Sequence, residues 1–419
     1  MKRLYIEKIH IDKVRHLKDI DIPLHDDESH EMRHLILTGR NGSGKTSLLE
    51  AIKGYLNSVS TTNDPYEAEK NLNQDIKTLS FQKQNGYSEN EIADTEKRIK
   101  SYKNRIASAK HGIDLTFNCA KNGMKAAFEK GSYILAYFGA HREFKAEEPK
   151  EIKKIPIKDA YAISDNPRAL FLSYMLDLKM TQALALANGN SEKASVISHW
   201  FDKIQSILRD IYEDDTLTLE FNEENYQFTI HEKNREPFDF NTASDGFSAI
   251  LDIIINLIMR MQEQDKRVVE FTKPGIVLVD EIENHLHLEM QKRVLKYLTD
   301  LFPNVQFIIT THSPFVLNSI QNAVIYDLEN HVLVKDGLSD LSYSGVVEGY
   351  FRTDELSEKL ENKYNRFKEL VKKKTLTDSE LAEIASLELY LDEIPDYLML
   401  NITTEYKKLK QEFENRKDI

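Results

Sequence analysis

The segment at residues 39 to 46 reads G-x-x-x-x-G-K-T, a spacing that can bind the phosphates of a nucleotide. Glycine lets the backbone curve tightly and turn its amide groups toward an anion. We expect Lys45 to contact the β- and γ-phosphates and Thr46 to place its hydroxyl on Mg²⁺. The cofactors that this segment predicts are therefore ATP and Mg²⁺. The residues predicted to contact the nucleotide here are Gly39, Arg40, Asn41, Gly42, Ser43, Gly44, Lys45, Thr46 and Ser47.

Two acids, Asp280 and Glu281, directly follow the apolar segment GIVLV. An aspartate at the end of a strand can complete the oxygen shell of Mg²⁺, so the predicted metal-binding pair is Thr46 and Asp280. The next acid, Glu281, can accept a proton from an attacking water. Adjacent acids also end strands without any function, but the phosphate-binding segment in the same chain favours the functional interpretation.

His312 follows a second apolar segment, VQFIITT. A neutral imidazole at such a strand end can form a hydrogen bond with the γ-phosphate and so sense its presence. A single histidine is more often a surface or core residue, but its place after the two acids favours a role in the site. The predicted catalytic residues are therefore Glu281 and His312.

Ser244 and Gly246 stand at the start of a long apolar segment that predicts a helix over about residues 245–264. A serine and glycine amides at the start of a helix can bind an anion. The same residues could equally form an ordinary helix cap. The order of the motifs along the chain is thus phosphate loop, serine–glycine segment, paired acids and histidine.

The elements that must position these residues are short apolar strands and helices. Residues 35 to 38 are apolar and partly β-branched, as in a buried strand, and residues 47 to 56 have apolar side chains at helical spacing. The phosphate loop is thus predicted between a strand and a helix, which is its functional context. Other predicted strands cover residues 3–11, 19–24, 113–118, 132–140, 216–221, 226–232, 275–281, 305–312, 322–328 and 331–336, and other predicted helices cover 166–212, 288–301 and the chain after 345.

Residues 60 to 112 differ in composition, because they are rich in lysine and glutamate and contain few apolar residues. The segments 66–84 and 90–110 have apolar residues at helical spacing, and NGYSE between them can turn. We predict an antiparallel helical hairpin, a short coiled coil, with helices of about 19 and 21 residues and a length of roughly 30 Å. A flexible charged loop is the alternative.

The composition favours a protein of the reducing cytoplasm. Cys119 is the only cysteine among 419 residues, which excludes intrachain disulfides and a cysteine metal cluster. The first residues, MKRLYIEKIHI, predict no signal peptide, and no apolar segment reaches the ~18 residues of a membrane helix, so no membrane partner is expected. The net charge of −13 argues against broad, non-specific DNA binding but not against a local basic stripe.

The order and spacing of these motifs resemble the ABC ATPases, whose signature motif reads LSxGE or LSxGQ. The corresponding residues 243–247 are ASDGF, so the leading leucine and the final acid are replaced. The segments DEIENHLH and ITTHSPF look like the RecF/SMC/OLD branch of these ATPases, and the resemblance covers most of residues 1–335. It implies an α/β fold, an ABC ATPase head with a P-loop, a mixed sheet and a helical lobe, to which a short helical hairpin and a helical C-terminal tail are added.

The resemblance also implies that two heads meet head to tail, in a dimer or a higher homo-oligomer. Ser244 and Gly246 of one subunit would then close over the nucleotide on the phosphate loop of the other, and the D-loop would correspond to residues 283–286. The Q-loop glutamine of the family is absent after the predicted strand at 132–140. His141 or Arg142 could contact a phosphate or Mg²⁺-bound water there, or Arg142 could be a salt-bridge partner.

The expected domains are an ATPase head formed by residues 1–59 and 113–335, the hairpin insertion at 60–112 and a helical C-terminal region at 336–419. The hairpin has no cysteines for a zinc hook. The acidic cluster of the Toprim nuclease that OLD enzymes carry is not recognisable after residue 330. A head without an effector of its own resembles the ATPase components of bacterial anti-phage systems of the Septu, retron-associated or PARIS type.

This resemblance implies a switch or sensor that binds ATP, hydrolyses it slowly and controls a separate effector, a nuclease or a toxin, with a phage protein or DNA as the trigger. The alternative is a RecF-like ATPase that acts on DNA in repair and recombination. Glutamates interleave the lysines of residues 355–374, which is more typical of a solvated helix face than of a DNA-binding surface. A transporter ATPase is disfavoured by the NHLH segment and by the hairpin.

Overall fold

The computed structural model divides the chain into two compact units, Met1–Asp340 and Leu341–Ile419. The described residues are 4–25, 31–61, 65–118, 122–149, 151–233, 235–263, 270–338, 358–373, 375–392, 400–414 and 416. Within these ranges no helix combines the length and the apolar character that a membrane crossing requires.

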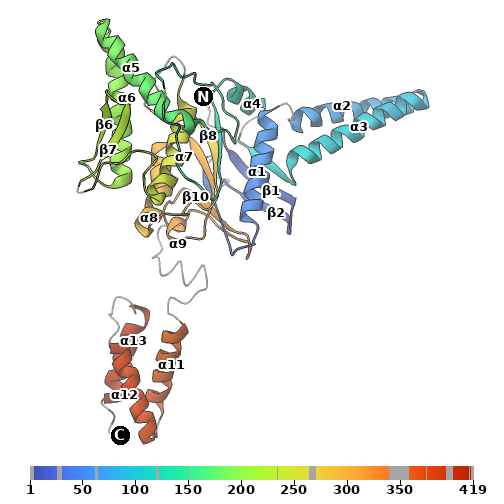
Figure 1. Ribbon diagram of the computed structural model, residues 1–419. Helices are drawn as coiled ribbons and strands as arrows, with labels where there is room; N and C mark the ends of the chain where they lie inside the picture. The colour runs from blue at the N-terminus through green and yellow to red at the C-terminus, as the bar shows by residue number, and fades with distance from the viewer. Residues whose placement is uncertain are drawn as a thin grey trace. The chain divides into compact units, whose positions relative to one another are not determined.

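A six-stranded sheet forms the centre of the first unit (Figure 1). In spatial order its strands are β11 (Val332–Val334), β10 (Ala323–Asp327), β3 (His34–Thr38), β9 (Val305–Thr310), β8 (Gly275–Val279) and β5 (Ile134–Phe138). β11 is antiparallel to β10, and the other strands run parallel. Every residue of β3, β8, β9 and β10 is buried, as expected of parallel strands covered on both faces. The segments that follow the parallel strands therefore lie along one edge of the sheet.

A second, three-stranded antiparallel sheet shares a core with the central one. Its strands are β2 (Leu17–Pro23), β1 (Ile6–Val14) and β4 (Ile113–Phe117), with β1 in the middle. The helix α1 (Lys45–Ser60) contributes apolar side chains such as Leu48 and Ile52 to this shared core. The side chain of Gln306 on β9 binds both backbone groups of Ile6 on β1, at 2.8 and 2.9 Å, and so ties the two sheets together.

A helical lobe lies on the side of the head away from the hairpin (Figure 1). Its elements are the 3₁₀ helix η1 (Pro167–Leu170), α5 (Phe171–Ala187), α6 (Ser191–Tyr212), β6 (Thr218–Asn222), β7 (Gln227–His231) and α7 (Asp245–Met261). The core of the lobe is aromatic, because Phe171 packs against Phe144, Trp200 and Phe240 with ring centroids 5.4 to 6.3 Å apart. The first turn of α7 thus belongs to a tightly packed helical lobe.

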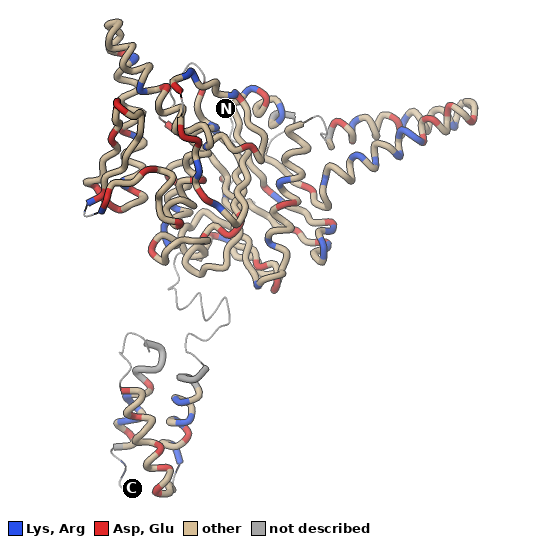
Figure 2. Tube along the Cα trace, in the orientation of Figure 1, with Lys and Arg blue, Asp and Glu red and all other residues tan. Residues whose placement is uncertain are grey.

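The insertion forms the predicted antiparallel hairpin, which projects from the head as an arm (Figure 1). Its helices are α2 (Pro65–Gln84) and α3 (Glu89–Lys110). Charged residues of both signs alternate along it (Figure 2). Ion pairs cross between the helices, Lys83 to Glu96 at 2.8 Å and Arg98 to Asp75 at 2.9 Å. The two predicted helices are therefore present and the alternative of a flexible loop is wrong, while the coiled coil stays a prediction.

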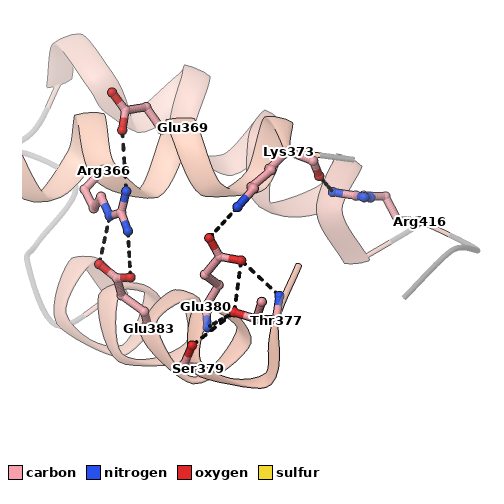
Figure 3. Close-up of polar contacts among 8 residues, drawn as sticks. All are labelled: Arg366, Glu369, Lys373, Thr377, Ser379, Glu380, Glu383 and Arg416. Carbon is pink, nitrogen blue, oxygen red and sulfur yellow. Dashed lines mark hydrogen bonds and ion pairs between the residues drawn. The ribbon is translucent and has the colours of Figure 1, made fainter. Parts of the chain in front are cut away.

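The described residues of the second unit form the helices α11 (Glu358–Lys372), α12 (Asp378–Asp392) and α13 (Leu400–Glu414). They share an apolar core of their own, to which Phe367, Leu391 and Leu409 belong. On the surface Arg366 makes two hydrogen bonds to Glu383 (Figure 3). These contacts confirm the helical character predicted for the C-terminal region, while the predicted residues 339–357 lie outside the described part of the chain.

The predicted α/β fold with a mixed sheet and added helical segments is confirmed. The remaining elements are α4 (Asn122–Glu129), α8 (Leu288–Leu301) and α9 (Pro314–Leu317). α4 and α9 were not predicted, because they are too short to show an apolar period. The helical segment predicted over residues 166–212 is divided into η1, α5 and α6, and Gly189, with a φ of 73°, separates α5 from α6.

Candidate functional site

The phosphate loop connects β3 to α1 at the carboxyl edge of the central sheet. Its glycines Gly39, Gly42 and Gly44 have φ values of 130°, 85° and 99°, a region that other residues rarely adopt. Gly44 is also the N-cap of α1, and a Cβ there would lie 3.0 Å from a methyl group of Leu17. The spacing of the glycines is thus required by the backbone itself, which directs the amides at the start of α1 toward the loop.

Lys45, the first residue of α1, is buried, with an exposed fraction of 6%. Its ammonium group donates to the carbonyl oxygens of Gly39 at 2.7 Å and Arg40 at 3.0 Å. Burial lowers the pKa of Lys45, while the nearby carboxylates, Glu281 first among them, act in the opposite direction. The lysine is therefore held inside the curve of the loop, where it can exchange these carbonyl contacts for phosphate oxygens.

Thr46 and Asp280 come together although they are distant in the sequence. The hydroxyl of Thr46 donates to Oδ1 of Asp280 at 3.3 Å, and the hydroxyl of Thr310, at the end of β9, donates to the same oxygen at 2.6 Å. Asp280 is buried, with an exposed fraction of 3%. A carboxylate and a hydroxyl beside a phosphate loop fit Mg²⁺, which binds through one or two carboxylates together with substrate phosphates.

Glu281 has an unusual backbone conformation, with a φ of +46°. A left-handed conformation costs a residue with a side chain roughly 1–2 kcal/mol. The amide of Glu281 donates to Oγ1 of Thr310 at 2.7 Å, and the amide of Ile282 donates to the carbonyl of Thr310 at 3.1 Å. Among the described residues no hydrogen bond engages the half-buried carboxylate of Glu281, so it is available to a water molecule.

Arg142, which follows β5, binds backbone carbonyls rather than a carboxylate. Its two NH₂ groups donate to Asp280 O at 2.5 Å, Glu281 O at 2.7 Å, Gly139 O at 2.8 Å and Ile282 O at 3.3 Å. Burial lowers the pKa of Arg142 to about 10, which leaves the guanidinium charged at neutral pH. The structure thus gives Arg142 a third role, different from the phosphate contact and the salt bridge considered from sequence, while His141 is exposed.

His312 lies two residues beyond β9 and is half-buried. Its backbone amide donates to Oε1 of Glu283 at 2.5 Å. Burial, and then the charge of Lys45, lower the pKa of His312 below its ordinary value, which favours the neutral ring near pH 7. The role of a neutral imidazole at this position stays a prediction, and the contact with Glu283 holds the backbone of His312.

Ser244 is the N-cap of α7, but its side chain makes no capping hydrogen bond and is exposed. A Cβ added to Gly246 would lie 2.8 Å from the carbonyl oxygen of His285, so only glycine fits where α7 meets the predicted D-loop. In the described part of the chain, no hydrogen bond or ion pair joins Ser244 or Gly246 to the phosphate loop. The ordinary side-chain cap that was the alternative for Ser244 is therefore not formed.

Several residues of the site had no sequence signal. Thr310 sits within the segment IITTH, but only its contacts with Asp280 and Glu281 distinguish it from the threonine beside it. His16, at the turn between β1 and β2, contacts the carbonyl of Ser43 in the phosphate loop at 3.1 Å. Together with Tyr326 and His331, His16 lines an open pocket of about 390 Å³ beside that loop.

A protein-family model described as "AAA domain, putative AbiEii toxin, Type IV TA system" matches residues 152–318. This range contains Ser244, Asp280, Glu281 and His312, and it begins after the phosphate loop. The chain is therefore similar to this family of AAA domains over residues 152–318.

Curated proteins similar to this chain have related names. Retron Ec83 probable ATPase of Escherichia coli is 34% identical over 125 residues, 29% of this chain and 23% of that protein. Septu protein PtuA of Bacillus mycoides (strain KBAB4) is 25% identical over 337 residues, 78% and 41% of the two chains. Retron Vc95 probable ATPase of Vibrio cholerae serotype O1 biovar El Tor is 26% identical over 213 residues, 48% and 40%. The predicted resemblance to Septu and retron-associated ATPases is confirmed, and the chain spans less than half the length of each relative.

Among solved structures, the Smc head bound to the C-winged helix domain of ScpA is 14% identical, with 80% of this chain and 96% of that chain covered and a TM-score of 0.36. The Smc head domain with an extended coiled coil from Pyrococcus furiosus is 11% identical, with 84% and 100% covered and a TM-score of 0.38.

Proposed function

We propose that this protein is a Mg²⁺-dependent ATPase of the ABC type that acts as a switch for a separate effector in anti-phage defence. The observation that supports this most is the contact between Thr46 of the phosphate loop and Asp280 at 3.3 Å. These two side chains would hold Mg²⁺ near Lys45, on which the charges of Asp280 and Glu281 act. The names of the relatives, Septu and retron ATPases, support the place of this ATPase in defence.

In the proposed reaction the phosphate loop binds the triphosphate through its amides and through Lys45. Thr46 and Asp280 hold Mg²⁺, which neutralises charge that develops on the phosphate oxygens. Glu281 accepts a proton from the attacking water, and His312 donates a hydrogen bond to the γ-phosphate. The pocket beside the loop, which His16 and Tyr326 help to line, is the proposed place for the base.

The second half of the site would come from another copy of the chain. The start of α7 presents an exposed serine hydroxyl and helix amides, which favour an anion. Within the proposed head-to-tail dimer these groups would contact the γ-phosphate on the partner's phosphate loop. ATP binding would then close the dimer, and hydrolysis would release it, which gives the switch its two states.

The effector, a nuclease or a toxin, would dock on a surface away from the nucleotide. The hairpin of α2 and α3 and the C-terminal unit are the candidates, because none of the residues predicted for the nucleotide site belongs to either segment. Asp392, an acid of the C-terminal unit, is bound by Tyr406 at 2.8 Å and Lys410 at 2.5 Å, which supports a structural role for it rather than a catalytic one.

The test of the proposed reaction is phosphate release by the purified chain with Mg²⁺ and ATP. Glu281→Gln should lower kcat by about 10² to 10⁴-fold and keep ATP affinity, since an amide cannot accept the water's proton. Asp300→Asn is the matched control, because this exposed acid pairs with Lys296 at 2.8 Å near the end of α8, away from the residues assigned to the site. Hydrolysis by Glu281→Gln at the wild-type rate would contradict the assignment.

The test of the switch is co-purification with the products of neighbouring genes, with and without ATP. We expect a nuclease or toxin to bind in a nucleotide-dependent way, and the ATPase alone to leave DNA intact. Metal-dependent cleavage of DNA that follows this chain through further purification would replace the proposal by a nuclease of the OLD type.

A further inference from the structure

Three successive backbone carbonyls converge on one side chain in the turn that carries the candidate catalytic acid. The carbonyls of Asp280, Glu281 and Ile282 all accept hydrogen bonds from the guanidinium of Arg142, at 2.5, 2.7 and 3.3 Å. The same guanidinium donates to Gly139 at the end of β5, at 2.8 Å. Because the arginine is fixed to β5, it fixes the turn against the sheet.

The backbone amides of the turn are held as well. The amide of Asp280 donates to the carbonyl of Phe138 at 2.8 Å, and the amide of Glu281 donates to Thr310 at 2.7 Å. Glu281 needs both restraints, because its φ of +46° is unfavourable for a residue with a side chain. This backbone conformation sets the direction in which the carboxylate of Glu281 leaves the turn.

Arg142 begins a short extended segment that also contacts α7. In residues 142–146, which we call the strap, the alternate side chains Arg142, Phe144 and Ala146 are buried. The amide of Phe144 donates to Oγ of Ser248 in the first turns of α7 at 2.7 Å. Ala146 exchanges two hydrogen bonds with the side chain of Asn241, at 2.8 and 3.1 Å, just before α7.

We propose that Arg142 is a positioning residue for hydrolysis, which holds Glu281 in its active direction, and that the strap links this turn to the start of α7. The proposal rests on the proposed ATPase function. In this role Arg142 replaces the Q-loop glutamine that the chain lacks. Unlike that glutamine, Arg142 acts on the protein backbone rather than on the nucleotide. In the proposed dimer, a nucleotide bound to the phosphate loop of the partner contacts the start of α7. A movement of α7 caused by this contact is transmitted by the strap to the turn that carries Glu281.

The chain contains a second buried arginine that serves as a matched control. Arg260, near the end of α7, also binds four backbone carbonyls, those of Leu135, Tyr161, Ala162 and Asp165. Burial lowers the pKa of both arginines to about 10. The two differ in their location, since the carbonyls that bind Arg260 belong to β5 and to residues 161–165 rather than to the catalytic turn.

The experiment compares Arg142→Lys with Arg260→Lys in kcat, ATP affinity and thermal midpoint. Lysine keeps the charge but cannot reach three carbonyls with one planar group. We expect Arg142→Lys to lower kcat by about tenfold to a hundredfold, because a misplaced catalytic group reduces the rate to that extent. Its ATP affinity should stay within about threefold of wild type, and Arg260→Lys should keep kcat within about twofold, whatever its midpoint.

An unchanged kcat in Arg142→Lys, or a loss of ATP affinity as large as the loss of kcat, would overturn the proposal, the latter in favour of a phosphate contact. If Arg142→Lys does not fold, Ser248→Ala tests the strap with the arginine in place. A fall in its kcat at unchanged affinity supports the proposal, and an unchanged kcat overturns it. Lys45→Ala and Glu281→Gln are measured in parallel, because full activity in both would refute the ATPase site itself rather than the role of Arg142.

Discussion

The phosphate-loop half of the candidate site and its signature half differ in how much of their chemistry one chain contains. In the first half Lys45, Thr46 and Asp280 are buried or bound to one another through hydrogen bonds. In the second half Ser244 is exposed and its side chain makes no cap, although it begins a helix of 17 residues. A helix start of that length carries amides that favour an anion. This difference agrees with the proposed composite site, in which the first half binds the nucleotide and the second half meets a nucleotide held by another copy of the chain.

The largest expected effect concerns the self-contained half. Lys45→Ala should weaken ATP binding by about a hundredfold or more, because charge-assisted hydrogen bonds worth about 3 kcal/mol are lost. Lys53→Ala, on the same helix but paired with Glu50, is the control and should bind ATP normally. Equilibrium binding of a fluorescent ATP analogue measures both. If Lys45→Ala bound ATP as tightly as the wild type, the phosphate-loop half would not bind the nucleotide through Lys45. The proposed difference between the two halves of the site would then be lost.

The next effect tests whether the signature half acts in a second chain. Lys45→Ala and Ser244→Arg should each abolish hydrolysis, while their equal mixture should recover about a quarter of the wild-type rate, since half of the dimers carry one intact composite site. Each variant mixed with itself is the control. A mixture that stays inactive at all ratios would show that both halves serve a site within one chain.

A smaller effect is expected for the pH dependence of His312. Its pKa is lowered below 6.5, so the neutral ring persists as the pH falls to that value and is lost only in more acid solution. Hydrolysis should therefore be constant from about pH 8 to about pH 6.5 and fall below it. His312→Gln cannot titrate, so it should lower the rate at pH 7.5 by about tenfold and lack the acid limb. If the hydrolysis rate of that variant still falls in acid solution as it does in the wild type, a group other than His312 causes the fall.

The smallest effect on the nucleotide site is expected from the hairpin. Replacement of residues 66–109 by a short Gly-Ser bridge should leave ATP affinity within about twofold of wild type, because the ends of an antiparallel hairpin lie close together. Binding of the effector should be lost. A finer variant replaces Phe81 and Tyr87, the exposed aromatic pair near the hairpin turn, with serine. A loss of ATP binding on removal of the hairpin would mean that the arm completes the site.

The sequence predicted the parts of the site whose chemistry is local. The phosphate loop needs glycines at fixed positions, and the acids and the histidine follow apolar strands, so all of them leave a pattern. Thr310 and Arg142 leave none, because their partners lie at distant positions in the chain and their residue types are common. The missing glutamine marked the place of Arg142, but only the fold shows that its donors face three carbonyls.

The fold was predictable to a similar extent. Buried strands such as β8 and β9 are continuous apolar segments, and α2 and α3 show a helical period. The order of the strands in the sheet is a matter of long-range pairing, which no local pattern encodes. That order is what brings Thr46, Asp280 and Thr310 to one point.

The hairpin has a mechanical consequence. Lys110 at the end of α3 contacts Asp114 at 3.0 Å, and Asp114 accepts a hydrogen bond from Tyr55 of α1 at 3.1 Å. A force applied to the tip of the hairpin is therefore transmitted to α1, the helix that begins with Lys45, without crossing the central sheet. The ion pairs between the two helices lie at the surface, and added salt weakens surface ion pairs. We therefore expect the hairpin to be stiffer at low than at high salt concentration.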